Sequence, residues 1–67
     1  MTKSERENWL CNIRSLAATL EQEAGWKPVR FILETFGGGA SCIETLHPGY
    51  YEAVYHELFD RVAGLKD

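Results

Sequence analysis

The sequence predicts an all-α fold: a three-helix bundle with a short helical turn in the loop before the last helix. Apolar residues recur at helical spacing in three stretches, prolines stand near the starts of two of them, and glycines stand at their ends. The chain of 67 residues has room for one domain, 1–67, with a small core, because a chain of this length buries only about 60% of its unfolded surface.

The first helix is expected over residues 4–24. Ser4 and Glu7 have the spacing of a capping box, in which each side chain satisfies a backbone N–H of the other residue. Gly25 ends the helix. The apolar residues form one stripe, made of Trp9, Ile13, Leu16 and Leu20 and widened by Leu10, Ala17 and Ala24.

The second helix is expected over residues 27–36, with Pro28 in its first turn and Gly37 at its end. Its apolar face consists of Val29, Ile32, Leu33 and Phe36, and Phe31 lies off that face. The same stretch is rich in β-formers and also fits a strand. A helix is preferred because the apolar positions do not alternate.

The segment between the second and last helices contains three glycines, followed by a second capping-box spacing at Ser41 and Glu44. This spacing predicts a short helical turn over residues 42–46. His47 precedes a proline, which biases it away from helical backbone, and it is expected to act as a cap.

The last helix is expected over residues 48–63, with Pro48 at its first position and a left-handed Gly64 after its end. Its inner face is aromatic and aliphatic, and its outer face is acidic. The inner stripe consists of Tyr51, Val54, Tyr55, Leu58, Val62 and Leu65.

Charge is distributed unevenly along the chain. Residues 1–33 carry five basic and four acidic side chains (+1), whereas residues 34–67 carry two basic and six acidic ones (−4), for a net charge of −3. An acidic half disfavours direct binding of a nucleic-acid backbone and suits a partner with a basic surface. No signal peptide or membrane-spanning stretch is visible, so we expect a cytoplasmic protein.

The sequence shows no arrangement of residues that is typical of a catalytic or metal-binding site. Zinc would have to be held by Cys11, Cys42, His47 and His56, whose spacings form no compact ligand pair. We therefore expect Cys11 to pack in the core, His56 to lie on a solvated face, and the two cysteines to remain unbridged.

The sequence also lacks the residue patterns of a cysteine nucleophile, a phosphate-binding loop and a glycosidase. A Cys42 nucleophile with His47 or His56 as base would need a pocket that a small bundle hardly offers. The glycines at 37–39 lack the lysine of a phosphate loop. The carboxylate pairs suit solvated helix faces better than a glycosidase cleft. We expect no catalytic residue, no cofactor and no metal.

A helix-turn-helix regulator is an alternative architecture for three short helices. The connection from Gly37 to His47 is much longer than the usual turn of that motif. Its recognition helix would carry Glu52, Glu57 and Asp60 but a single arginine within residues 48–63, which is unfavourable for DNA contacts.

The apolar, capping and aromatic pattern over residues 26–62 resembles small uncharacterised helical proteins of gut bacteria and their mobile genetic elements. The pattern has two parts, Val29-x-Phe31-Ile32-Leu33-x-x-Phe36-Gly37 and Ser41-x-Ile43-Glu44-x-Leu46-x-Pro48-x-Tyr50-Tyr51-x-x-Val54-Tyr55-x-Glu57-Leu58. The resemblance implies accessory cargo of a plasmid, phage or conjugative element, and an anti-CRISPR inhibitor is one such protein. It carries no active-site residues.

We therefore predict a non-enzymatic protein-interaction module that binds a partner with a basic surface. The alternatives are a self-associating structural module and a small helix-turn-helix-like transcriptional regulator. Trp26 is expected to fold over the core as a lid, although an exposed anchor is the competing interpretation. The surface expected to bind the partner consists of Trp26, Tyr50, Glu52, His56, Glu57, Phe59 and Asp60.

Overall fold

A computed structural model describes residues 1–65 and confirms the all-α three-helix bundle. Its helices are α1 (Lys3–Ala24), α2 (Trp26–Phe36) and α3 (Tyr51–Leu65). Two short 3-10 turns, η1 (Ile43–Thr45) and η2 (Pro48–Tyr50), lie between α2 and α3, and η2 leads directly into α3. The alternative of a strand over residues 29–36 is wrong, because this stretch is helical throughout.

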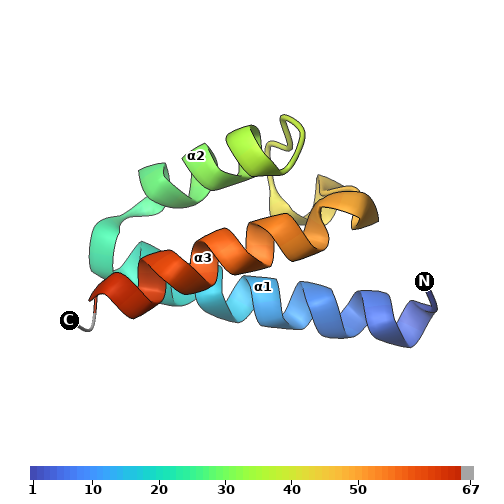
Figure 1. The fold of residues 1–67 in the computed structure, drawn as a ribbon. Helices are drawn as coiled ribbons and strands as arrows, with labels where there is room; N and C mark the ends of the chain where they lie inside the picture. The colour runs from blue at the N-terminus through green and yellow to red at the C-terminus, as the bar shows by residue number, and fades with distance from the viewer. Residues whose placement is uncertain (66–67) are drawn as a thin grey trace.

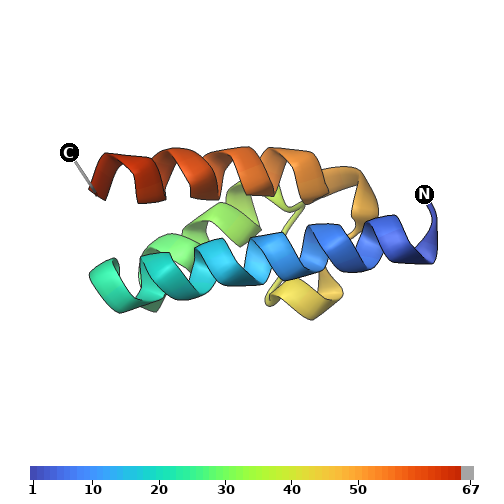
Figure 2. The same cartoon turned by 90° about the horizontal axis from the view of Figure 1, so that it is seen from below.

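The helices α1 and α3 run side by side in the same direction, and α2 returns antiparallel to both (Figure 1). Seen from below, α1 and α3 lie in front and α2 lies behind them (Figure 2). One side of the α1–α3 pair is thus covered by α2. We call the opposite side, which no other helix of residues 1–65 covers, the α1–α3 face.

The core is one cluster between the three helices and η1. Apart from Ile43 and Leu46, which lie in and just after η1, its members come from the predicted stripes, which confirms the helical spacing on which the fold was predicted. The buried apolar residues are Ile13, Ala17, Leu20, Val29, Ile32, Leu33, Ile43, Leu46, Tyr51, Val54, Leu58 and Val62. Within the described residues, no charged side chain is buried, so the core contains no ion pair.

Tyr51 is the largest fully buried side chain, and its hydroxyl has no hydrogen-bond partner among the described residues. A buried polar group without a partner destabilises the folded state. Tyr51→Phe is therefore expected to raise the free energy of unfolding by about 1 kcal/mol. Thermal denaturation measures this change. A lower melting temperature for Tyr51→Phe would mean that the hydroxyl is hydrogen-bonded in solution.

The N-terminal cap of α1 lies two residues earlier than predicted. Thr2 Oγ1 accepts a hydrogen bond from the Glu5 backbone N–H at 3.2 Å, and the Thr2 backbone N–H donates to Glu5 Oε1 at 3.5 Å. The predicted box at Ser4 and Glu7 is wrong because the Thr2–Glu5 pair has the same spacing and allows a longer helix. Gly25 ends α1 as expected, with a φ of 83°.

The turn before the last helix also uses a different box from the one predicted. Cys42 and Thr45 cap η1, with the Cys42 N–H donating to Thr45 Oγ1 at 3.4 Å, in place of Ser41 and Glu44. The helical turn is accordingly shorter than residues 42–46. His47 acts as the predicted cap, because its Nδ1 accepts from the Gly49 N–H at 3.0 Å.

Gly64 was expected to end the last helix in a left-handed conformation, and this is wrong. The helix α3 continues through Gly64 to Leu65, and Gly64 is not among the positive-φ glycines. The structure describes the backbone of Leu65 but not its side chain, so the predicted place of Leu65 in the apolar stripe lies outside what is described, as do positions 66 and 67.

Two burial predictions are also wrong. Cys11 is exposed rather than in the core, because two residues along a helix turn a side chain about 200° away from buried Ile13. Trp26 keeps 41% of its surface exposed and forms no lid over the core. A single residue, Gly25, separates α1 from α2, which leaves Trp26 at the end of the bundle.

An exposed ion pair joins α1 to η1, where Arg14 Nη2 lies 3.4 Å from Glu44 Oε1. The pKa of Glu44 lies below its ordinary value, chiefly through hydrogen bonding by its own backbone amide and further through the charge of Arg14. A lowered folded-state pKa stabilises the fold above the ordinary carboxyl range. That contribution is lost as the pH falls through the folded-state value.

Glu44→Gln is therefore expected to flatten the acid side of the stability profile, which melting temperatures between pH 7 and about pH 3 would measure. Glu7→Gln is the matched control, because Glu7 takes part in none of the ion pairs of residues 1–65. Identical acid-side slopes for the wild type and Glu44→Gln would contradict the prediction.

None of the helices within residues 1–65 combines the length and apolar character that crossing a lipid bilayer requires.

Candidate functional site

No ring contact joins any two of the four most exposed aromatic side chains of residues 1–65. Phe31 and Phe59 are each 51% exposed, Tyr50 is 44% exposed and Trp26 is 41% exposed. Trp26 begins α2, Tyr50 ends η2, and Phe59 lies on α3. The three aromatic residues predicted to bind the partner, Trp26, Tyr50 and Phe59, are therefore not in ring contact with one another.

A row of three aromatic rings crosses the α1–α3 face. Trp9 on α1 meets Tyr55 on α3 edge to face, with ring centroids 5.5 Å apart and an interplanar angle of 79°. Tyr55 in turn stacks on Phe59, with centroids 6.2 Å apart and an angle of 27°. Trp9 and Tyr55 are half-buried and pack against the core, whereas Phe59 is exposed. The row is therefore fixed by the core on its inner side and open to solvent on its outer side.

A hollow of about 340 Å³ opens beside this row, and we call it the Trp9 hollow. Four of its residues lie on one side of α1, at positions i, i+3, i+4 and i+7, and the fifth comes from α3. They are Glu5, Asn8, Trp9, Asn12 and Tyr55. This lining joins two aromatic rings with one carboxylate and two amides, and it includes no lysine or arginine.

A smaller hollow of about 120 Å³ lies on another side of Trp9 and includes Glu52 of α3 and Tyr51. Trp9 thus belongs to two hollows, each of which contains a glutamate. The Oε1 atom of Glu52 lies 3.8 Å from Nε2 of His56, one turn further along α3. The indole of Trp9 is consequently the centre of an acidic and aromatic surface.

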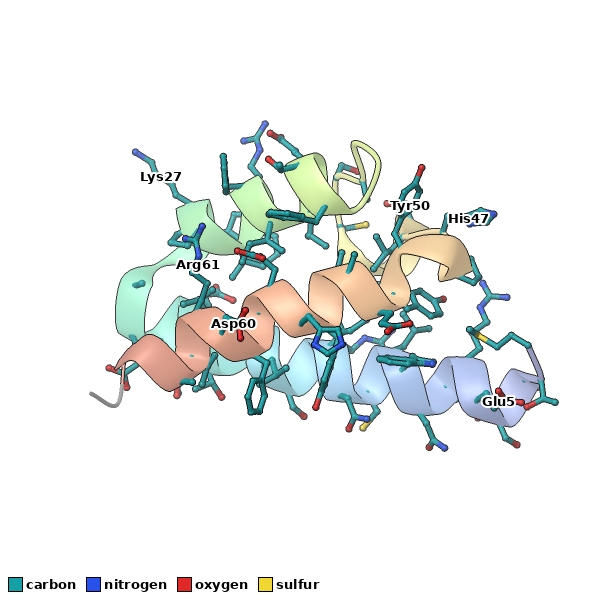
Figure 3. The ribbon with its side chains drawn as sticks, in the orientation of Figure 1. Glu5, Lys27, His47, Tyr50, Asp60 and Arg61 are labelled. Atoms are coloured by element: carbon teal, nitrogen blue, oxygen red, sulfur yellow. The ribbon has the colours of Figure 1, made fainter. Side chains whose placement is uncertain are left out.

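The remaining acidic residues of α3 are placed differently. Glu57 pairs with Arg61 at 3.8 Å, and the Arg61 guanidinium lies 5.8 Å from the ring centroid of Phe31 on α2. Figure 3 shows Arg61 directed from α3 towards α2, whereas Asp60 points outward. Glu57 therefore belongs to the α2–α3 side of the molecule, away from the Trp9 hollow.

Tyr50 and His47 lie together at the end of the molecule where α2 passes into the loop (Figure 3), with ring centroids 6.2 Å apart. Together with residues 37–41 and Thr45, they line a third open hollow of about 350 Å³. His47 Nδ1 is already occupied by the cap of η2. This corner is built by loop capping, and its lining contains no lysine, arginine, aspartate or glutamate.

The cysteines and histidines singled out from the sequence do not meet. Cys11 is exposed on α1, and Cys42 is half-buried at the start of η1, where its Sγ lies 3.6 Å from Thr45 Oγ1. Both thiols are free. Among residues 1–65, no three His, Cys, Asp or Glu side chains gather closely enough to hold a metal ion.

The α3 side of the Trp9 surface was predicted in part, through Glu52, His56 and Phe59. The α1 side was missed, because Trp9 was assigned to the core stripe. One signal could have found it: polar Glu5, Asn8 and Asn12 stand at helical spacing beside Trp9, which places them on one flank of the stripe.

Searches of protein-family models, curated proteins and solved structures give no match to this chain.

Proposed function

We propose that this chain is a non-enzymatic interaction module that binds a protein with a basic surface through its α1–α3 face. The row of Trp9, Tyr55 and Phe59 bordered by Glu5 and Glu52 carries this proposal. Aromatic rings at protein interfaces supply contact area at small entropic cost, and glutamates around them favour a basic partner.

Charge also favours a different protein over a second copy of this chain. Two copies meeting through their α1–α3 faces would place the Glu5 and Glu52 carboxylates of both chains in one interface. Like charges across an interface oppose association. Self-association remains an outcome that sedimentation would reveal, as a mass twice that of the 7.6 kDa chain.

An inhibitor encoded by a mobile genetic element would fit this chemistry. It would act by occupying the basic nucleic-acid channel of a host nuclease complex. We also propose that it acts in the cytoplasm, where two free thiols persist. Such a partner would be bound stoichiometrically, and added salt would weaken the complex.

The test is affinity capture from a lysate of the native host, followed by measurement of binding to the purified captured protein. Charge reversal by Glu52→Lys on the α1–α3 face is expected to weaken binding at least about tenfold. Glu7→Lys makes the same charge change at a residue that lines none of the three hollows, and it should bind like the wild type.

Equal affinity of both variants for the captured protein, or binding that does not depend on salt, would overturn the proposal. Capture of duplex DNA instead of a protein would favour the alternative of a helix-turn-helix regulator, which the acidic residues of α3 disfavour.

A further inference from the structure

We propose that the Trp9 hollow is a binding site for the guanidinium group of an arginine side chain on the partner. The inference rests on the proposed function and specifies which chemical group the partner inserts. Five residues line the site, namely Glu5, Asn8, Trp9, Asn12 and Tyr55.

The aromatic walls suit a planar cation. The rings of Trp9 and Tyr55 stand at 79° to each other, so a guanidinium that stacks on one ring meets the edge or face of the other. A cation over an aromatic face is attracted by the ring quadrupole, and tryptophan gives the strongest attraction. Arginine stacks on such faces more readily than lysine, because its charged group is flat and weakly hydrated.

The lining of the hollow also offers hydrogen-bond acceptors for the N–H groups of a guanidinium. Asn8 and Asn12 both line the hollow, and each carries a side-chain amide whose oxygen can accept a hydrogen bond. Both hydrogen bonds that Thr2 donates to Glu5 use Oε1, so the cap of α1 does not engage Oε2. A guanidinium carries five N–H donors in a fixed fork, which matches several acceptors around one aromatic surface.

The chain holds one of its own arginines in a comparable arrangement. On the α2–α3 side, the Arg61 guanidinium lies 5.8 Å from the Phe31 ring centroid, and its Nε lies 3.8 Å from Glu57 Oε1. That site combines an aromatic ring, a carboxylate and a guanidinium. The Trp9 hollow combines two rings and a carboxylate, and no lysine or arginine of residues 1–65 contributes to its lining.

Glu52 extends the negative field to the other side of the indole, through the smaller hollow that it shares with Trp9. On the same turn of α3, His56 Nε2 lies 3.8 Å from Glu52 Oε1. Lower ionic strength should strengthen binding, because the carboxylates at the hollow are exposed.

The experiment uses the two tryptophan indole N–H resonances of the ¹⁵N-labelled chain. N-acetyl-arginine amide is titrated into the protein, and N-acetyl-citrulline amide serves as the uncharged probe of the same shape. The Trp9 indole resonance is expected to shift with the arginine probe and saturate in the millimolar range, and to shift little with citrulline. Trp26, exposed at the other end of α1, provides an internal reference that should stay in place.

Glu5→Gln removes the carboxylate charge and keeps a residue type that completes a capping box, so the helix start should persist. This variant is expected to lower the affinity for the arginine probe about threefold. Glu7→Gln is the matched control, with unchanged affinity. The melting temperatures of both variants show whether the fold is intact.

Equal shifts with arginine and citrulline, or equal shifts of Trp9 and Trp26, would overturn the inference. Such a result leaves the proposed function standing if a captured basic protein still binds more weakly to Glu52→Lys. A Trp9 shift specific to arginine, without any captured partner sensitive to Glu52→Lys, supports the site and counts against the proposed function.

Discussion

Leu58→Ala should unfold a large fraction of the molecules near physiological temperature. Leu58 is fully buried at the middle of α3, in the cluster that joins all three helices. Truncating a buried leucine removes its transfer free energy and leaves a cavity, at a loss of about 2–5 kcal/mol. Domains of 67 residues have a total stability of only about 3–10 kcal/mol, so the loss is a large share of it.

The melting temperature of Leu58→Ala is expected to be at least about 10 °C lower than that of the wild type. Circular dichroism at the helical band measures this change. Phe59→Ala is the matched control, because Phe59 is the larger side chain and the next residue along α3 but is 51% exposed. It should lose about 0.5–1.5 kcal/mol, through its stacking on Tyr55. A larger loss for Phe59→Ala than for Leu58→Ala would show that α3 is rotated from the orientation described.

Gly37→Ala is the second substitution with a large expected effect. Gly37 is buried at the C-terminal end of α2, with a φ of −102° that any residue adopts, so its backbone does not require glycine. A methyl group there would lie 2.5 Å from the Leu33 carbonyl oxygen and 2.6 Å from Cδ1 of Leu46. Leu46 is itself only 3% exposed and has little room to move.

Overpacking of this kind is expected to lower the free energy of unfolding by about 1–3 kcal/mol, as measured by urea denaturation. Gly64→Ala is the opposite control, because Gly64 lies within α3 and an added Cβ would meet no atom within 4 Å. Alanine is the better helix former, so this variant should gain up to about 1 kcal/mol. A stable Gly37→Ala variant would mean that the contact between Leu46 and the end of α2 is looser than described.

The spacing of apolar residues was sufficient to predict three helices and most of the core. That spacing reports which side of a helix is buried, and burial decides the architecture of a small bundle. Caps were harder to predict. Thr2–Glu5 and Ser4–Glu7 share one spacing, and the choice between them depends on a few tenths of a kcal/mol in the first turn.

The candidate surface could be predicted only on its α3 side, from the aromatic and acidic residues around Phe59. Its α1 side depends on how two helices far apart in sequence align, and local spacing contains no such information. Trp9 therefore looked like one more core residue, although its indole is half-buried between two hollows. The lid predicted for Trp26 failed for a similar reason, because the position of α2 relative to the end of α1 decides its exposure.

The most direct test of the account is whether the rings of Trp9, Tyr55 and Phe59 meet in solution across α1 and α3. Nuclear Overhauser spectroscopy of the free protein should show cross-peaks from the Trp9 indole to the Tyr55 ring, and from the Tyr55 ring to Phe59. Cross-peaks from Trp9 to side chains of α2 in their place would contradict the described packing, and with it the α1–α3 face as the site of binding.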